Sequence, residues 1–157
     1  MKTWKLYIPE IAFAALSLFI GGIGGILTKN GMPAYETMTK PWFTPPAWAF
    51  PIVWTILYIL MGIGMGRVWK RGGPTLQSSL WFFGVQLMLN LFWTVWFFIL
   101  QLYGISFVWL LLLLLAVMAM QRSFRTADET AAKLQIPYIL WLLLAAALNY
   151  GVWMLNS

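Results

Sequence analysis

Five long apolar stretches divide this chain and constrain its fold more than any other feature. A helix needs about 20 apolar residues to cross the hydrocarbon core of a bilayer, and we expect such spans at residues 6–27, 47–69, 79–100, 104–121 and 134–155. Hydrophobic residues make up 62% of the chain and charged residues 9%, so a soluble fold could not bury the apolar surface. Lipid offers no partners to exposed backbone groups, and no strand-like alternation supports a barrel. The sequence therefore predicts an all-α integral membrane protein, a five-transmembrane-helix bundle that fills residues 1–157 as a single membrane domain.

The basic residues are distributed unevenly between these spans. On the side of the N-terminus fall Lys2, Lys5, Arg67, Lys70, Arg71, Arg122, Arg125 and Lys133, whereas only Lys29 and Lys40 fall on the other side. The positive-inside rule then predicts a cytoplasmic N-terminus and an external C-terminus in a bacterial cytoplasmic membrane. The formal charge of +6 is spread between hydrophobic runs, so the lipid bilayer and its headgroups explain it better than nucleic acid does.

The chain lacks most of the side chains that catalysis at neutral pH requires. Histidine and cysteine are absent from the sequence, and the acidic residues are Glu10, Glu36, Asp128 and Glu129. Only Glu10 falls within a span, in its first turns, where a carboxylate can reach the interface and stabilise the positive end of the helix. The sequence therefore predicts no catalytic residues and no metal site, and it argues against conventional hydrolysis.

The longest stretch expected outside the helices, the outer loop at residues 28–46, is rich in proline and aromatic residues. It contains Pro33, Tyr35, Pro41, Trp42, Phe43, Pro45 and Pro46. Proline fixes φ and biases the residue before it toward extended conformations, so we expect a rigid loop. Such a loop either anchors the protein at headgroup depth or forms a lid over one end of a cavity between helices.

Two middle spans carry aromatic and polar residues on single helix faces. Trp54 and Tyr58 are four residues apart, so they share a face of the second span. In the third span, Asn90 and Trp93 are three residues apart, and Asn90 falls near the middle of the bilayer. An amide at that depth needs a hydrogen-bond partner, which is either another helix or a polar group of a ligand.

The last span repeats this pattern with Tyr138, Trp141 and Ala145 at positions i, i+3 and i+7. A stripe of this kind packs against another helix or forms a ligand wall. Three helices that each offer aromatic residues with an amide or a phenol favour a shared pocket.

Small residues form two further faces, which consist of Gly21, Gly22, Gly24 and Gly25 in the first span and Gly62 and Gly66 in the second. Glycine lets helix backbones approach closely. These faces pack either within one protomer or between protomers, so a homodimer is possible.

The order of these motifs resembles the translocator protein family, also called TspO or tryptophan-rich sensory protein. The resemblance rests on five segments in sequence order: Tyr35; Lys40-Pro41-Trp42-Phe43-Thr44-Pro45-Pro46 followed by Trp54, Leu57-Tyr58 and Met61-Gly62; Leu89-Asn90 with Trp93 and Phe97-Phe98; Pro137-Tyr138 with Trp141 and Ala145; and Leu148-Asn149-Tyr150. It covers nearly the whole chain. Three departures stand out: Ala34 replaces an aromatic residue, the family's loop tryptophan is at Trp42 rather than at position 43, and no Lys or Arg follows Tyr150. The last departure leaves the proposed sterol-recognition pattern incomplete.

The resemblance implies a five-helix bundle, commonly dimeric, with a pocket beneath the first loop. Members bind porphyrins such as protoporphyrin IX and benzodiazepine-type drugs. Carried over by position, the ligand-binding residues would be Tyr35, Pro45, Trp54, Asn90, Trp93, Tyr138, Trp141 and Ala145. No cofactor is required, and porphyrin is expected as a ligand.

Three functions remain open at this point. The first is a porphyrin-binding membrane receptor, sensor or carrier, in which Lys29 and Lys40 would meet the propionates. Because no His or Cys can ligate haem iron, we expect a preference for metal-free porphyrin unless Tyr or Met ligates the iron. The second is light-dependent porphyrin degradation through pocket tryptophans, and the third is a proton-coupled multidrug exporter that uses Glu10.

Overall fold

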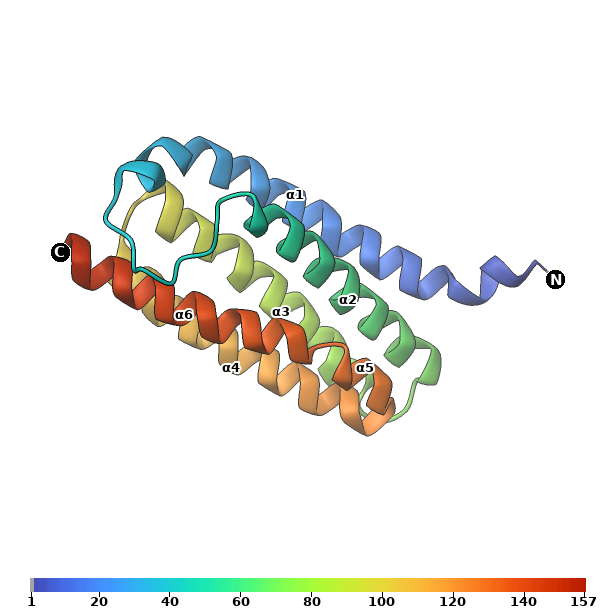
Figure 1. Ribbon diagram of the computed structural model, residues 1–157. Coiled ribbons are helices and arrows are strands. Elements are labelled where there is room, and N and C mark those ends of the chain that lie inside the picture. The colour runs from blue at the N-terminus through green and yellow to red at the C-terminus, as the bar shows by residue number, and fades with distance from the viewer. Residues whose placement is uncertain (1) are drawn as a thin grey trace.

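The structure, a computed structural model that describes residues 2–157, consists of helices joined by short connections (Figure 1). In chain order these are the 3-10 helix η1 (Thr3–Tyr7), α1 (Ile8–Thr37), α2 (Ala49–Arg71), α3 (Leu76–Thr94), the π-helix η2 (Val95–Ile99), α4 (Tyr103–Ala127), α5 (Glu129–Lys133) and α6 (Ile136–Asn156). Residues 2–157 contain no strand. The prediction of an all-α fold is therefore confirmed.

Adjoining helices together form five continuous helical segments that are long and apolar enough to cross a membrane: Thr3–Thr37, Ala49–Arg71, Leu76–Ile99, Tyr103–Ala127 and Glu129–Asn156. Consecutive segments run in opposite directions, so the two termini lie at opposite ends of the bundle (Figure 1). The protein is a five-helix integral membrane bundle, as the sequence predicts.

Glycine brings α1 and α2 into contact along the half of the bundle nearest the N-terminus. A methyl group on Gly62 would collide with the backbone of Ala14, and one on Gly66 would collide with the backbone of Glu10. Close backbone approach of this kind is how membrane helices gain packing energy without a hydrophobic driving force. Of the two arrangements that the sequence leaves open, Gly62 and Gly66 therefore pack within the chain.

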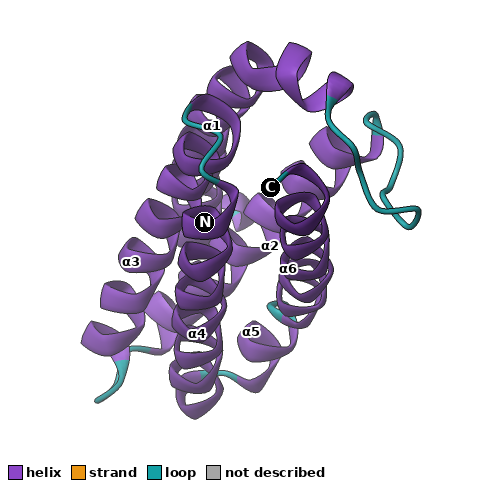
Figure 2. Ribbon diagram, turned by 90° about the vertical axis from the view of Figure 1, so that its left-hand side faces the viewer, coloured by secondary structure: helices purple, strands orange, loops and turns teal. Residues whose placement is uncertain are grey.

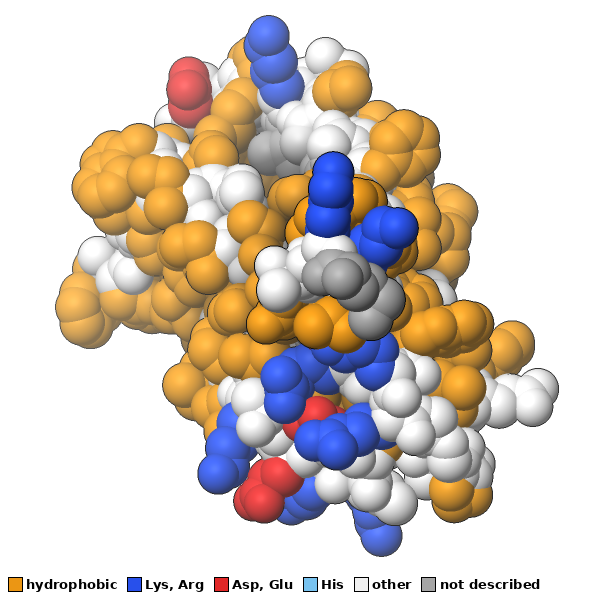
Figure 3. Space-filling view, turned by 90° about the vertical axis from the view of Figure 1, so that its right-hand side faces the viewer, with side chains coloured by type: hydrophobic (Ala, Val, Ile, Leu, Met, Phe, Trp, Pro, Cys, Tyr) orange, Lys and Arg blue, Asp and Glu red, His pale blue; other side chains and the backbone are white. Residues whose placement is uncertain are grey.

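Lys and Arg side chains gather at the end of the bundle that carries the N-terminus (Figure 3). There Asp128 accepts hydrogen bonds from the backbone N–H of Ala131 at 2.9 Å and from Arg71 at 3.3 Å, and it pairs with Arg67 at 3.1 Å. Burial alone would raise the pKa of Asp128, but the Ala131 hydrogen bond and the two guanidinium groups outweigh it and lower the pKa below its usual value. The carboxylate thus joins α2 to the connection between α4 and α5.

Glu10 lies in the first turn of α1, as predicted, but it does more than cap the helix. Its buried carboxylate pairs with Lys70 of α2. The Lys70 ammonium also donates to the Leu6 carbonyl oxygen at 3.1 Å. The sequence predicts a charge at the start of the helix, and the structure adds an ion pair between α1 and α2.

The outer loop is shorter than predicted, because α1 continues to Thr37 and the loop occupies residues 38–48 rather than 28–46. The apolar run ends near residue 27, but a helix ends where its backbone groups find other partners. Beyond the apolar run, Gly31 packs against the backbone of Phe98, which holds the extension in place. The Lys40 ammonium then donates to the carbonyl oxygens of Tyr35 and Glu36 at 2.9 and 3.3 Å, which satisfies the last turn.

The loop at 38–48 crosses to the C-terminal end of α6 and stands at the edge of the bundle (Figure 2). The Asn156 side chain accepts from the Thr39 N–H at 3.1 Å and donates to the Thr39 carbonyl oxygen at 2.7 Å. Pro41 lies directly on Gly151. Trp42, in contrast, is 94% exposed, in a position suited to headgroup depth. The loop is therefore fixed to α6 and presents one indole to its surroundings.

Candidate functional site

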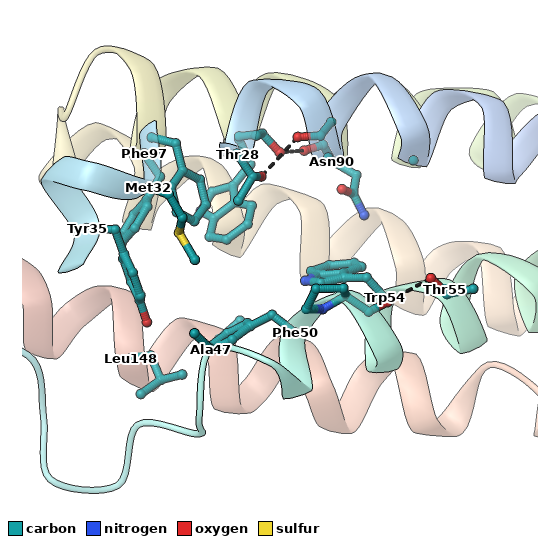
Figure 4. A pocket seen from close by; sticks show the side chains of 18 of the residues that line it. Thr28, Met32, Tyr35, Ala47, Phe50, Trp54, Thr55, Asn90, Phe97 and Leu148 are labelled. Carbon is teal, nitrogen blue, oxygen red and sulfur yellow. Dashed lines mark hydrogen bonds between the residues drawn. The ribbon is translucent and has the colours of Figure 1, made fainter. Parts of the chain in front are cut away.

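A cavity of about 420 Å³ lies within the bundle at the end that carries the C-terminus. Its walls come from α1, from the start of α2 with the preceding loop, from α3 and η2, and from α6 (Figure 4). This volume falls in the usual range of small-molecule sites, roughly 300–1,000 Å³. None of the described residues that line it is charged.

Seven aromatic rings contribute to the cavity wall. The Trp54 and Trp93 ring centroids are 6.4 Å apart, and Trp93 stacks on Phe97 at 5.5 Å. Tyr35 meets Phe50 edge-on at 6.3 Å. Figure 4 shows Tyr35 and Phe97 toward one end of the cavity and Trp54 toward the other, with Phe50 between them. The space that these rings surround is suited to a flat apolar molecule.

The π-helix η2 shapes one part of this wall. Its widened turn is marked by the hydrogen bond from the Leu100 N–H to the Val95 carbonyl oxygen at 2.9 Å. Two consecutive residues, Phe97 and Phe98, both line the cavity. Such π-turns are frequent at functional sites because they re-aim side chains within a helix.

The inner end of the cavity is formed by hydrogen-bonded polar side chains. The Tyr58 hydroxyl donates to Asn90 Oδ1 at 3.0 Å, and Asn90 Nδ2 donates to the Tyr138 hydroxyl at 2.8 Å. Tyr138 in turn donates to Gln86 Oε1 at 2.8 Å. Asn90 therefore bonds helix to helix, which confirms one of the two predicted roles, and it also lines the cavity.

Five of the eight site residues predicted from the sequence line this cavity: Tyr35, Trp54, Asn90, Trp93 and Ala145. They come from α1, α2, α3 and α6, which shows that the aromatic stripes of these helices do converge.

The other three predicted residues lie just outside the wall. Tyr138 is 1% exposed and occupied by the hydrogen bonds described above. Trp141 stands behind the wall, with its ring 5.7 Å from that of Phe50 and 6.4 Å from that of Trp54. Pro45 follows Thr44 in the outer loop, and Thr44 supplies the lining instead. The stripe on α6 therefore turns only Ala145 toward the cavity.

The lysines expected to meet propionates are placed differently from the prediction. Lys40 is engaged as the cap of α1, where its ammonium also donates to the Met38 carbonyl oxygen at 3.3 Å. Lys29 belongs to α1 rather than to a loop, and its side chain is exposed. Lys29 thus remains a candidate partner for an anionic group at the outer edge, whereas Lys40 would first have to release three carbonyl oxygens.

Several lining residues were not predicted. Met32 lies on the part of α1 that the sequence assigns to a loop, so its orientation could not be inferred. Phe97 belongs to a segment that carries the resemblance but not to the predicted binding residues; it is four residues after Trp93 and seven after Asn90, a spacing that could have revealed it. Asn149 likewise belongs to such a segment, and it accepts a hydrogen bond from the Trp93 indole at 3.0 Å, which the sequence does not reveal.

One side of the cavity opens between α1 and α2. Exposed residues of both helices belong to its lining: Leu18, Gly22, Gly25, Pro51 and Thr55. A methyl group on Gly22 or Gly25 would meet nothing within 4 Å. The opening faces outward from the bundle, toward the hydrocarbon of a surrounding bilayer.

A second hollow, of about 620 Å³, lies on the outside of the bundle between α1, α3 and α4. Trp81, Phe92 and Trp109 are among its lining residues. It is more open than the internal cavity and lacks a hydrogen-bonded polar floor like that of Tyr58 and Asn90.

Together, five apolar helices define a polytopic membrane protein with an uncharged internal cavity lined by aromatic rings. Comparison with known proteins identifies this class further, because the profile of the TspO/MBR family matches residues 13–154. The chain therefore belongs to the TspO/MBR family.

Individual relatives agree with this assignment. The tryptophan-rich protein TspO of Chlorobaculum tepidum is 36% identical over 146 residues, which cover 90% of this chain and 91% of that protein. Protein CrtK of Rhodobacter capsulatus is 36% identical over 87% of this chain and 85% of its own length. The human translocator protein is 33% identical over 94% of this chain and 89% of its own. The similarity thus extends across bacterial and animal members and over nearly the full length.

Proposed function

We propose that the protein is a membrane receptor, sensor or carrier that binds porphyrins of the protoporphyrin IX type, and other flat hydrophobic molecules such as benzodiazepine-type compounds, in the internal cavity. The observation that carries the proposal is the convergence of Trp54 and Trp93 with Tyr35, Phe50 and Phe97 around one uncharged space. Each stacked aromatic contact contributes about 0.5–1.5 kcal/mol beyond the burial of area.

The position of the cavity supports a ligand that arrives from the bilayer. Its side opening lies between the glycine face of α1 and the start of α2, where Gly25 and Pro51 are both exposed. A hydrophobic molecule dissolved in lipid can pass through this opening without crossing water. Thr44 and Ala47 of the loop at 38–48, which is pinned to α6, line the same space.

The side chains that could ligate iron in the cavity are few, which favours a metal-free porphyrin. Axial ligation of haem iron in proteins relies on His, Cys, Met or Tyr, and of these the cavity wall offers only Met32, Tyr35 and Tyr58. Tyr58 already shares its hydroxyl with Asn90. We therefore expect protoporphyrin IX to bind more tightly than haem, and equal affinities would count against this preference.

Binding can be tested with purified protein in lipid nanodiscs. Protoporphyrin IX should quench the tryptophan fluorescence in a saturable manner, and a benzodiazepine-type compound should displace it if both use the cavity. The exposed Trp4, at the opposite end of the bundle, offers a matched control: Trp4→Leu should leave the affinity unchanged. If quenching by protoporphyrin IX does not saturate, or only equals its quenching of free tryptophan, the proposal is contradicted.

A second candidate function, light-dependent porphyrin degradation, is favoured by the pair of cavity tryptophans. The Trp54 and Trp93 ring centroids are 6.4 Å apart in the cavity wall, where a bound macrocycle would contact them. Its photoexcited state would take one electron from an indole, and the electron would return to the indole radical cation as dioxygen adds to the macrocycle, so that macrocycle and dioxygen together give the product. Illumination of bound protoporphyrin IX should then give products that Trp54→Phe suppresses. Identical products at the same rate without protein would exclude catalysis.

The basic end of the bundle supports a cytoplasmic N-terminus. Lys70 and Arg71 end α2 there, and Lys133 ends α5 at the same end, as the positive-inside rule requires of a cytoplasmic face. A reporter fused to the C-terminus should be active only outside the cytoplasm, and cytoplasmic activity would reverse the assigned orientation.

A further inference from the structure

The polar floor of the cavity is one end of a longer hydrogen-bonded chain that runs into the core. Beyond Tyr138, the Gln86 amide completes the chain, because Gln86 Nε2 donates to the Met61 sulfur at 3.3 Å. Gln86 and Met61 are both fully buried. Five side chains from α2, α3 and α6 are thus linked in the order Tyr58, Asn90, Tyr138, Gln86 and Met61.

The Met61 sulfur fixes the direction of every bond in this chain. A thioether accepts hydrogen bonds but cannot donate them, so the Gln86 amide must turn its nitrogen to Met61 and its oxygen to Tyr138. Tyr138 must then donate to Gln86, which leaves its oxygen to accept from the Asn90 nitrogen. Asn90 consequently offers its oxygen to Tyr58, whose proton is committed to that bond. The opposite direction would leave the buried Gln86 oxygen against the sulfur and without a donor.

At the cavity, this direction leaves the Tyr58 hydroxyl with only acceptor capacity. The threonine hydroxyls of the wall are committed in the same way, since each donates to a backbone carbonyl oxygen of its own segment: Thr28 to Gly24, Thr44 to Pro41, Thr55 to Pro51 and Thr94 to Asn90. The oxygens of these hydroxyls can accept a hydrogen bond from a ligand. Their protons are already used, so these hydroxyls cannot donate to an acceptor on a ligand.

We infer that the Tyr58 hydroxyl at the cavity floor favours flat aromatic ligands that bring a hydrogen-bond donor, N–H or O–H, to it over ligands that bring an acceptor, and that Met61 and Gln86 are the positioning residues that set this preference from outside the cavity. The inference rests on the proposed binding of flat molecules in this space. It goes further by assigning the ligand's polar group and the residues that choose it.

The probes are three flat tricyclic molecules of one skeleton: carbazole with an N–H donor, fluorene with neither donor nor acceptor, and fluorenone with a carbonyl acceptor. Their affinities are measured by calorimetry on the full chain in nanodiscs, with empty nanodiscs to correct for partition into lipid. In the wild type, carbazole should bind about three- to tenfold more tightly than fluorene, the effect of one net hydrogen bond.

Met61→Leu removes the acceptor while nearly conserving volume. An orphaned buried N–H is less well tolerated than an under-satisfied carbonyl oxygen, so Gln86 should turn its nitrogen toward Tyr138 and the chain should reverse. Tyr58 then presents its proton to the cavity, and the carbazole-to-fluorenone affinity ratio should fall about three- to tenfold. Met65→Leu is the matched control, because Met65 is equally buried four residues further along α2, and it should leave the ratio unchanged.

Gln86→Leu provides a second route to the same reversal, since leucine has no atom that can accept the Tyr138 proton. Agreement of Met61→Leu and Gln86→Leu, with Met65→Leu unchanged, supports the inference even if one variant folds poorly. An affinity ratio that is the same in the wild type and in both variants would overturn it while leaving the proposed function intact. Failure of all three probes to bind the wild type would overturn both.

Discussion

Replacing Trp54 tests how the cavity binds a flat ligand, because Trp54 lies in the wall next to Trp93 whereas Trp141 lies behind it. One indole face covers about 50 Å² of a stacked ligand, roughly a quarter of what a buried aromatic side chain contributes. At about 25 cal/mol per Å² this contact contributes about 1.2 kcal/mol, and stacking adds about 0.5–1.5 kcal/mol. Leucine retains part of the apolar contact, so Trp54→Leu should cost about 1.5–2 kcal/mol, or about 10- to 30-fold in Kd.

Trp141→Leu should act only through the rings that it supports. It contacts Trp54 and Phe50 edge-on, so we expect a loss of affinity of about threefold or less, within the scale of one indirect packing change. Protoporphyrin IX titrations in nanodiscs measure both variants, and thermal unfolding with circular dichroism shows whether each remains folded. If both variants are as stable as the wild type and lose the same affinity for protoporphyrin IX, Trp54 does not contact the ligand more directly than Trp141 does, and the described cavity wall is wrong.

Four other changes probe the bundle around the site. Gly62→Ala should lower the thermal unfolding midpoint, because the methyl group meets the backbone of Ala14 and overpacking costs about 1–3 kcal/mol. Gly25→Ala should leave the midpoint unchanged, because its methyl group meets nothing within 4 Å; equal midpoints for the two variants would contradict the packing of α1 on α2. The lowered pKa of Asp128 stabilises the fold above the ordinary aspartate pKa of about 3.9 and ceases to do so as the pH falls through that value toward the folded-state pKa. The wild-type midpoint should therefore fall more steeply below about pH 4 than that of Asp128→Asn, and parallel pH curves would contradict this. Lys40→Met removes the cap of α1 and should increase amide hydrogen exchange in the last turn of α1 and in the following loop. Unchanged exchange in both segments would contradict the capping role of Lys40.

The fold could be predicted from the sequence because an apolar run of about 20 residues matches the thickness of the bilayer's hydrocarbon core. The positions where the helices end could not be predicted in this way, and α1 illustrates why. Its last ten residues, 28–37, include polar residues and Pro33, and they stay helical through contacts with η2 and the ammonium of Lys40. Both partners are distant in sequence or lie beyond the helix end, so no local pattern reveals them.

The site could be predicted in part for a similar reason. Periodicity places Trp54, Trp93 and Trp141 on helix faces with polar neighbours, but the rotation of each helix about its axis depends on packing. On α2 and α3 that rotation turns the indoles into the cavity, whereas on α6 it turns Ala145 inward and leaves Trp141 behind. The link from Gln86 to Met61 depends on the relative height of two helices, which spacing along one chain does not define.

The central claim is that a porphyrin lies inside the bundle, and a crystal structure of the protein with protoporphyrin IX tests it most directly. We predict the macrocycle in the internal cavity, against Trp54 and Trp93 and beneath the loop at 38–48, with the side opening between α1 and α2 beside it. A macrocycle found instead in the outer hollow against Trp81 and Trp109, with the internal cavity unchanged, would contradict the account.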